Sequence, residues 1–402
     1  MLHWINQFAV VDDQPGGTRH VEMARRLHAG GLPTRVVASD LNLSLRRYTR
    51  RHRSTDLRHI EEDVGGPRFV WLPAGSYEQN DWRRALSMVL FSLHVFVHLL
   101  LAPMPRGSVV IGSSPHLPGA LAARVAAWIR RVPFVLEVRD LWPESLAVDS
   151  DEPTLLYRVL RVVADVLYRW SDAIVVLAAG SVDAIVARGI DRDKITYIPN
   201  GVDPAAFDAA VPSRPSVVPA DAPLLVYAGA HGPANDLTTV LEAMSVLEER
   251  GADAHLILIG DGPSKPALRD HAAQLGLDNV TFFDPVPKSE IPALLKACEL
   301  GIMPLADVEL FQRAVSPNKL FDYLCAGLRV VSNVPGIVGG MVETSESGRT
   351  CPPADPEALA DSIVKTLDEP ATDKGRRWVA QEHSRDVLAE RLVGVLNAVR
   401  RT

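Results

Sequence analysis

The sequence has little cysteine and no low-complexity tract in its 402 residues. Its three cysteines, Cys298, Cys325 and Cys351, stand far apart in apolar or small-residue surroundings. We therefore expect reduced thiols, with neither a disulfide framework nor a metal site. Residues 1–15 lack the charged start, apolar run and small-residue cleavage site of a signal peptide, which favours a cytoplasmic protein. The length favours two domains over a single core.

Several motifs of enzyme chemistry are also missing. The chain contains no Walker A loop, no metal-ligand cluster and no nucleophile elbow of the form G-x-S-x-G. The segment Ile259-Gly260-Asp261-Gly262-Pro263 resembles a dinucleotide fingerprint only superficially, because Lys265 stands where the third glycine belongs. We interpret this segment as a tight strand-to-helix turn that lines a ligand cleft.

Lysine is absent from the first 193 residues, which carry 23 arginines and 21 acidic residues, a net charge of +2. The rest carries 19 basic and 28 acidic residues, so the whole chain has a net charge of −7. Six arginines crowd one polar segment: Arg46, Arg47, Arg50, Arg51, Arg53 and Arg58. This cluster fits an anionic partner, or it is a solvated loop. We expect no nucleic-acid partner.

Short apolar segments alternate with helical stretches in the first half of the chain. The predicted strands are Ile5–Val11, Thr34–Ala38, Arg68–Leu72, Val109–Gly112, Phe134–Val138 and Ala173–Leu177. Helical periodicity is clearest in Arg19–Ala29 and Pro118–Ile129. Apolar strands separated by helices predict parallel strands that are buried on both faces, and hence a doubly wound α/β domain.

A second alternating series follows residues 204–223, which are rich in proline and alanine and are predicted to be a linker. Its predicted strands are Leu224–Ala228, His255–Gly260, Val280–Phe283, Leu300–Pro304 and Arg329–Ser332. The last stretch, Arg376–Arg400, has the pattern of one or two amphipathic helices. We thus predict an α/β protein of two doubly wound Rossmann-like domains facing a central cleft, residues 1–200 and 201–375. Helices in 376–402 are expected to pack back on the first domain.

The strongest signal is Ser316-Pro317-Asn318-Lys319-Leu320-Phe321-Asp322-Tyr323. We expect Ser316 to cap a helix that begins at Pro317, so that exposed backbone N–H groups form an anion site. Lys319 adds a positive charge in the first turn, where it does not help the helix and so indicates a negative ligand. Asp322 follows on the same side of the predicted helix, where its carboxylate would accept hydrogen bonds from two vicinal hydroxyls of a ligand. The alternative is a core helix with a solvated lysine and aspartate.

This segment and its context resemble family 4 of the retaining GT-B glycosyltransferases. The resemblance covers nearly the whole chain and includes residues 15–24, 137–145, 198–203, 227–230 and 259–263. The form of residues 137–145, EVRDLWPES, is similar to a subgroup that adds N-acetylated amino sugars in surface-polysaccharide assembly. The whole-chain resemblance implies a GT-B fold whose first domain binds the acceptor and whose second domain binds the nucleotide sugar.

The resemblance also implies roles for individual residues. Asp322 matches the ribose-binding position of the family, while Ser316, Asn318 and Lys319 match the donor-phosphate segment. Gly16 and Gly17 match a glycine loop beside the donor diphosphate. Gly229 and His231 lie in the loop that faces the phosphates, and Val286 and Pro287 lie where the base is held.

Three departures from the family pattern bear on the catalytic groups. The first of the family's two carboxylates is missing, since Ala314 stands there. Arg139 and Asp140 replace a histidine that many members have. The region where members usually have an Arg and a Lys is occupied by His231 and Asn235. We therefore expect Lys319, helped by Arg313 or Arg139, to stabilise the leaving diphosphate. Arg139 and Asp140 are predicted to contact sugar or acceptor, or else to form a structural cluster.

The resemblance implies a retaining transfer of an N-acetylated amino sugar or hexose from a nucleotide-sugar donor, by family likeness UDP-linked. The acceptor would be a glycan, a lipid-linked molecule or a small molecule, and no metal or other cofactor is expected. Two other readings stay open. One is a nucleotide-sugar epimerase or hydrolase on the same fold, and the other is a non-catalytic sugar-nucleotide-binding partner.

Residues 82–102 are strongly apolar after Arg83 and Arg84 and nearly long enough to span a membrane. They stand between two predicted strands of one domain, so spanning would disrupt the fold. We expect a partly buried helix, either a core helix or one with an edge in an anionic membrane interface beside Arg46–Arg58 on the cytoplasmic side. His94 and His98 are expected to be packed or interfacial rather than metal ligands.

Overall fold

The computed structural model describes residues 1–14, 16–42, 45, 47–50, 58–77, 82–144, 155–308, 312–313 and 315–401. The chain divides into two compact units. The first comprises Met1–Pro199 together with Arg385–Thr402, and the second comprises Asn200–Ser384. The predicted C-terminal piece, 376–402, is therefore divided: α14 (Lys374–Glu382) is part of the second unit and only α15 (Arg385–Arg401) is part of the first.

An eight-stranded sheet forms the centre of the first unit, in the order β10-β9-β8-β7-β1-β2-β6-β5. All neighbouring strands are parallel except β5, which is antiparallel to β6. The strands are β1 (Leu2–Ile5), β2 (Thr34–Ser39), β5 (Ile60–Asp63), β6 (Arg68–Leu72), β7 (Val109–Ser113), β8 (Phe134–Val138), β9 (Ala173–Val176) and β10 (Ile195–Tyr197). A separate antiparallel pair joins β3 (Leu41–Asn42) and β4 (Arg47–Tyr48).

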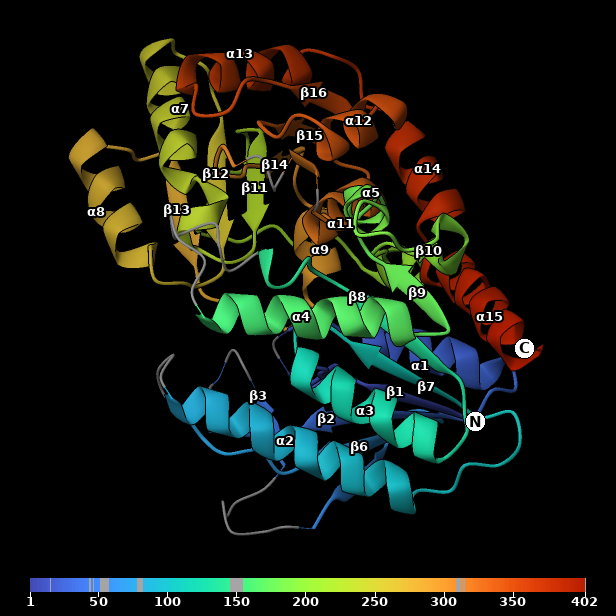
Figure 1. Cartoon of the computed structure of the whole chain (residues 1–402). Helices are drawn as coiled ribbons and strands as arrows, with labels where there is room; N and C mark the ends of the chain where they lie inside the picture. Colours follow the sequence, from blue (N-terminus) through green and yellow to red (C-terminus); the bar gives the residue numbers. More distant parts are fainter. Residues whose placement is uncertain are drawn as a thin grey trace. The chain divides into compact units, whose positions relative to one another are not determined.

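Helices cover both faces of this sheet. On one face α1 (Arg19–Ala29) packs beside α15, and both bury leucines against Trp4 and Ile111. On the other face α2 (Trp82–Leu101), α3 (Leu117–Ile129) and α4 (Leu155–Trp170) lie side by side, with α3 in the middle (Figure 1). The short helix α5 spans Gly180–Val186. The predicted doubly wound arrangement is confirmed.

The first predicted strand, Ile5–Val11, is wrong in its position. The strand is Leu2–Ile5, and a turn follows in which the Asn6 carboxamide oxygen accepts the backbone N–H of Phe8 at 2.8 Å. Asparagine favours such turns because its side chain competes for the backbone N–H groups that a strand would use. The apolar residues Ala9–Val11 are buried, but outside the strand.

The second unit contains a six-stranded, fully parallel sheet in the order β13-β12-β11-β14-β15-β16. Its strands are β11 (Leu224–Ala228), β12 (His255–Ile259), β13 (Val280–Phe283), β14 (Leu300–Met303), β15 (Arg329–Ser332) and β16 (Gly348–Thr350). Its helices besides α14 are α6 (Pro204–Ala209), α7 (Leu237–Glu249), α8 (Lys265–Leu275), α9 (Ile291–Leu295), α11 (Asn318–Ala326), α12 (Ile337–Thr344) and α13 (Pro356–Leu367). Helix α6 begins the predicted linker, where Asp203 caps it by accepting the N–H of Ala205. The three cysteines are free and buried.

The predicted site residues come directly after strands of these two sheets or at the start of a helix. Arg139 and Asp140 follow β8, Gly229 follows β11, and residues 284–288 follow β13. Parallel strands end at a common edge, so each sheet carries its candidate residues at the edge where α/β proteins bind ligands.

Candidate donor and sugar sites

Lys319 is half-buried in the first turn of α11. Its ammonium donates a hydrogen bond to Asn235 Oδ1 at 3.1 Å and lies 5.1 Å from the centroid of the Tyr227 ring. Burial lowers the pKa of Lys319 to about 8, because the charged form loses hydration. Among the residues that the structure describes, no carboxylate pairs with this ammonium. The arrangement holds a cation against neutral groups and suits an anionic ligand.

Gly229 makes room for Lys319. A Cβ at this position would come within 2.2 Å of Lys319 Cε. Gly260, with φ +146°, is equally constrained, since its Cβ would lie 1.9 Å from the Gly229 carbonyl oxygen. These two glycines let the turns after β11 and β12 lie against each other and against the lysine side chain.

The start of α11 differs from the prediction. The helix begins at Asn318, which is exposed, and Pro317 precedes it; Ser316 does not cap the helix. Instead, the Ser316 hydroxyl accepts the backbone N–H of Asn200 at 3.0 Å. A cap requires the side-chain oxygen to face the first-turn N–H groups, and this oxygen is already engaged elsewhere. The first-turn N–H groups of α11 are therefore not capped by Ser316 and stay available to an anion.

Asp322 forms an ion pair with Lys288, a residue that the sequence reasoning missed. The Asp322 side chain is only 14 % exposed and pairs through Oδ2. The half-buried Val286 and the exposed Pro287 come just before Lys288 in the segment after β13. The proximity of Lys288 to the proposed base-binding residues was the one signal that could have identified it. A carboxylate has room for further donors besides one ammonium.

His231 is placed less favourably than predicted, because its ring is fully buried. The ring lies near Tyr227 and Phe282, and neither of its nitrogens has a partner among the described residues. Burial lowers the pKa of His231 to about 4, so the ring is neutral. Its backbone N–H donates to the Asp261 carbonyl at 2.9 Å. The turn position of His231 matches the prediction, but the buried ring is not presented at the surface.

The residues around Lys265 explain the incomplete glycine motif. The Lys265 ammonium donates to the carbonyls of Gly260 and Phe283 at 2.8 and 2.9 Å and to Asp284 Oδ1 at 2.8 Å. It thereby links the end of β12 to the end of β13. The segment is a strand-to-helix turn, as predicted, and the bridging lysine is a feature that the prediction did not include.

In the first unit, Gly17 and Arg139 lie near each other. A Cβ on Gly17 would be 3.9 Å from Arg139 Nη2. Both are on or near the surface, as is Asp140. The hydroxyl of Ser114 accepts the Arg139 N–H at 2.9 Å and anchors the segment after β8. Gly16, at φ +141°, packs against Val10, where a Cβ would approach within 3.0 Å.

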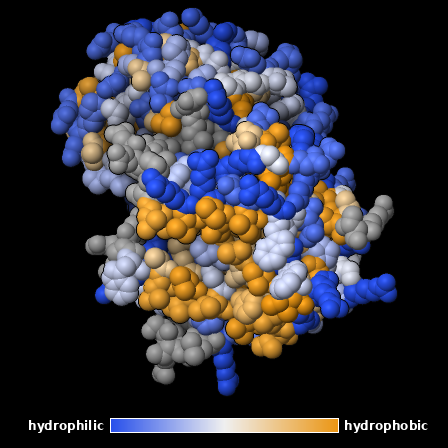
Figure 2. Space-filling view, viewed as in Figure 1, coloured by the Kyte–Doolittle hydropathy of each residue, from blue (hydrophilic) through white to orange (hydrophobic). Residues whose placement is uncertain are grey.

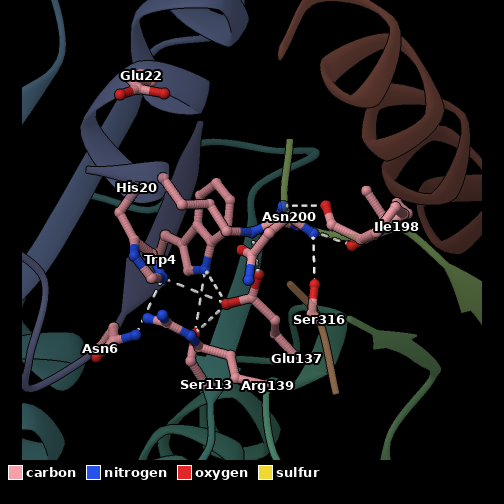
Figure 3. A network of polar contacts seen from close by, with 12 residues as sticks. Trp4, Asn6, His20, Glu22, Ser113, Glu137, Arg139, Ile198, Asn200 and Ser316 are labelled. Atoms are coloured by element: carbon pink, nitrogen blue, oxygen red, sulfur yellow. Dashed lines mark hydrogen bonds and ion pairs between the residues drawn. The ribbon is translucent and has the colours of Figure 1, made fainter. Parts of the chain in front are cut away.

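Glu137, one strand residue before Val138, is buried at the centre of a polar cluster (Figure 3). Its Oε2 accepts from the Ser113 hydroxyl at 2.6 Å and from Trp4 Nε1 at 3.2 Å, and it lies 3.3 Å from His20 Nε2. Its Oε1 accepts from the Nε of Arg19 at 3.2 Å. These partners hold the pKa of Glu137 well below its usual range although burial alone would raise it.

Arg19 extends this cluster to the end of the first unit. Its guanidinium also donates to the carbonyls of Pro199 and Ile198 at 2.6 and 3.2 Å. The predicted alternative of a structural arginine–carboxylate cluster therefore applies to Glu137 and Arg19. Arg139 also contributes its charge to the low pKa of Glu137, while Arg139 and Asp140 are the more exposed pair.

The arginine-rich segment is only partly described, since Arg46, Arg51 and Arg53 lie outside the described residues. Arg50 is not a free basic group: it pairs with Glu62 at 2.8 Å and Asp13 at 3.1 Å and lies over the Trp71 ring. Position 314, with the missing carboxylate, is also outside the described residues. His94 and His98 line a pocket of about 380 Å³ together with Arg35, His59 and Glu61.

Two family models match the chain. Residues 16–201 match a glycosyl transferase 4-like domain, and residues 222–369 match the model described as glycosyl transferases group 1. A curated relative, the 2-deoxystreptamine glucosyltransferase of Streptomyces kanamyceticus, is 27 % identical over 293 residues, which cover 66 % of this chain and 72 % of that protein.

Solved structures share the architecture over almost the whole chain. Sucrose-phosphate synthase from Thermosynechococcus elongatus gives a TM-score of 0.75 at 16 % identity, covering 99 % of this chain and 98 % of that one. The Anabaena protein HepE in complex with UDP-glucose gives a TM-score of 0.70 at 16 % identity, covering 99 % of both chains. At such identities the similarity establishes the fold.

Proposed function

This chain belongs to the glycosyltransferases of the GT-B fold, and we propose that it transfers a sugar from a UDP-linked donor with retention of the anomeric configuration. The observation that carries the proposal is the half-buried ammonium of Lys319 at the start of α11, which faces neutral groups. UDP is favoured because HepE, which has the same fold, binds UDP-glucose.

The diphosphate of the donor is the natural partner of Lys319. A partly buried cation without a counterion is unfavourable, and an anionic diphosphate both compensates the charge and accepts its hydrogen bonds. The first-turn N–H groups of α11 add donors at the same helix terminus. Gly229 is required here because a side chain would displace the lysine.

Asp322 is proposed to bind the ribose. Its carboxylate accepts several hydrogen bonds, so Lys288 and a ribose diol can share it. The ion pair holds the carboxylate in one orientation before the nucleotide arrives. Val286 and Pro287, which precede Lys288, are proposed to lie against the base.

The chemical step separates charge and so needs electrostatic stabilisation. The bond between the anomeric carbon and the diphosphate oxygen breaks, and its electron pair leaves with the nucleoside diphosphate. The acceptor hydroxyl forms the new bond on the same face and gives its proton to the departing phosphate. A preorganised donor such as Lys319 typically contributes about 3–4 kcal/mol to such a step. In this proposal the Lys319 ammonium and the N-terminus of α11 stabilise the negative charge of the diphosphate, as a divalent ion would.

Arg139 and Asp140 are proposed to act on the sugar or the acceptor. The Arg139 guanidinium lies beside Gly17, and Ser114 fixes the backbone from which Arg139 projects. We propose a hexose or an N-acetylated amino sugar as the transferred group, and a glycan, lipid-linked molecule or small molecule as acceptor. The amino sugar is favoured by the EVRDLWPES form of residues 137–145.

Nucleotide release measured with and without acceptor candidates tests the function. We expect UDP release from UDP-sugars to require an acceptor, to persist in EDTA, and to yield a product whose anomeric configuration matches the donor by NMR. Donor consumption without acceptor would instead identify a hydrolase or epimerase. Tight donor binding without any turnover would identify a non-catalytic binding partner.

A further inference from the structure

Helix α2 carries a continuous apolar stripe on its exposed side. The stripe consists of Trp82, Leu86, Val89, Leu93, Val97 and Leu101, which follow one another at helical spacing. Leu93 is 57 % and Leu101 is 80 % exposed. The opposite side, with Phe91, Val95 and Leu99, is the one buried in the first unit. Within the described residues this is the one helix long and apolar enough to span a membrane, yet only 22 % of its apolar window is buried.

A second apolar stripe runs along α4. It is formed by Leu155, Leu156, Val159, Val162 and Val166, with Leu155 78 % exposed. Helix α3 lies between α2 and α4 and exposes Trp128 and Ile129 at its end. The three helices therefore present one broad apolar face, which is visible as the orange bands in the lower half of Figure 2. A patch this continuous is uncommon on a soluble monomer and marks an interaction surface.

The charges carried by the three helices themselves are mostly positive. Helices α2 and α3 contain no acidic residue, and α4 contains a single one, Asp165, which pairs with Arg188 at 2.9 Å. Arg158, Arg161 and Arg169 are exposed on α4 and lie along one flank of its apolar stripe. Figure 2 shows a hydrophilic band directly beside the upper apolar band.

We infer that the α2–α3–α4 face of the first unit docks on an anionic lipid bilayer. The apolar stripes would enter the boundary between headgroups and acyl chains, and the arginines of α4 would contact lipid phosphates. A second copy of this chain fits the same face less well, because a two-fold contact would bring identical arginine rows together, and Asp165, the one carboxylate on these three helices, already pairs with Arg188. Spanning is disfavoured because the buried side of α2 would have to leave the sheet.

This surface adds the arginines of α4 to the one expected from the sequence. The expectation joined residues 82–102 to Arg46–Arg58; in that segment Arg50 is engaged by carboxylates, and Arg46, Arg51 and Arg53 lie outside the described residues. The inference does not depend on glycosyl transfer, so a failed activity assay leaves it intact.

Vesicle flotation of the full chain tests the inference. We expect the protein to float with vesicles of phosphatidylcholine mixed with phosphatidylglycerol, to float weakly with phosphatidylcholine alone, and to be released by salt. The double variant Arg158→Gln/Arg161→Gln should weaken partitioning into the mixed vesicles about tenfold or more. The pairs Leu86→Gln/Leu93→Gln and Leu156→Gln/Val159→Gln should each weaken it by at least about tenfold.

Val211→Gln/Val217→Gln is the matched control, since both valines are highly exposed but belong to the second unit. It should bind vesicles like the unchanged protein. Tryptophan quenching by brominated lipids gives a second measurement that does not depend on the stability of the glutamine variants. Quenching should be strong in the unchanged protein and largely lost in Trp82→Phe/Trp128→Phe.

Absence of flotation with anionic vesicles would overturn the inference, as would equal binding by the α4 variants and the control. Concentration-dependent dimerisation without lipid, abolished by the same glutamine pairs, would also overturn it and assign the face to a second copy of the chain.

Discussion

Two charged clusters at sheet edges, one in each unit, differ in how completely their charges are satisfied. In the first unit Glu137 is fully buried and engages Arg19, Ser113 and Trp4. In the second unit Lys319 has one neutral hydrogen-bond partner, Asn235, among the residues described. The first cluster pairs its buried charges within the protein, whereas the second leaves the Lys319 ammonium beside neutral groups, which is the basis of the proposed donor site.

The same position in the fold therefore does not imply the same role. Both clusters lie near the carboxyl ends of parallel strands, where the following segments bring polar side chains close together. What separates them is whether each buried charge has an opposite charge beside it. Arg139 and Asp140 stand one and two residues beyond the Glu137 strand and are more exposed than Glu137, and their contact with sugar or acceptor is a proposal.

The largest effect should come from breaking the saturated cluster. Glu137→Ala leaves the Arg19 guanidinium buried without its counter-ion, so we expect the free energy of unfolding to fall by about 3–5 kcal/mol. Chemical denaturation measures this. Asp386→Ala is the control, because Asp386 pairs with Arg26 at 2.8 Å but is 67 % exposed, and its loss should cost less than about 1 kcal/mol. An equal loss of unfolding free energy in the two variants would show that the Glu137 cluster contributes no more to stability than a surface ion pair.

The next effect concerns the ribose. Asp322→Ala removes charge-assisted acceptors worth about 1.5–3 kcal/mol, so UDP affinity should fall about tenfold to a hundredfold. Calorimetry with UDP and with its 2′,3′-dideoxy analogue measures the contribution of the diol. The unchanged protein should prefer UDP, and the variant should bind both alike. The double variant Lys288→Met/Asp322→Ala controls for the lysine left without its partner; a preference for UDP that survives in Asp322→Ala would remove Asp322 from the site.

A smaller effect is expected from pH. Burial lowers the pKa of Lys319 to about 8, so the ammonium is charged below this pH and loses its proton as the pH rises through it. Donor kcat/KM should therefore fall about tenfold per unit above pH 8, because this ratio follows ionisations of the free enzyme. Lys319→Arg keeps its charge and should move the fall to higher pH. An unchanged profile in that variant would assign the ionisation to another group.

The sequence predicted the regular parts of the molecule well for a physical reason. Buried parallel strands such as Phe134–Val138 and Leu224–Ala228 are almost entirely apolar, so their bounds agree with the structure. The edge strands β5 and β16 were missed because their exposed or half-buried residues lack this pattern. Ile5–Val11 was misplaced because buried apolar residues outside a strand look like a strand in sequence.

The site was predicted in its parts but not in its contacts. The Ser316–Tyr323 segment and the glycines could be recognised from local pattern and family likeness. The Lys288–Asp322 pair, the burial of His231 and the Ser316–Asn200 hydrogen bond depend on residues distant in sequence, which no local pattern encodes. Glu137 and Arg139 also differ in burial, since Glu137 is fully buried and Arg139 only partly, although the two stand in one short motif.

The central claim is that Lys319 stabilises the departing diphosphate, and turnover of Lys319→Ala tests it most directly. We expect kcat with a UDP-sugar and its acceptor to fall about a hundredfold or more while the melting temperature stays nearly unchanged. Lys365→Ala, an exposed lysine on α13 of the same unit, should turn over normally. Near-normal turnover of Lys319→Ala would contradict the account.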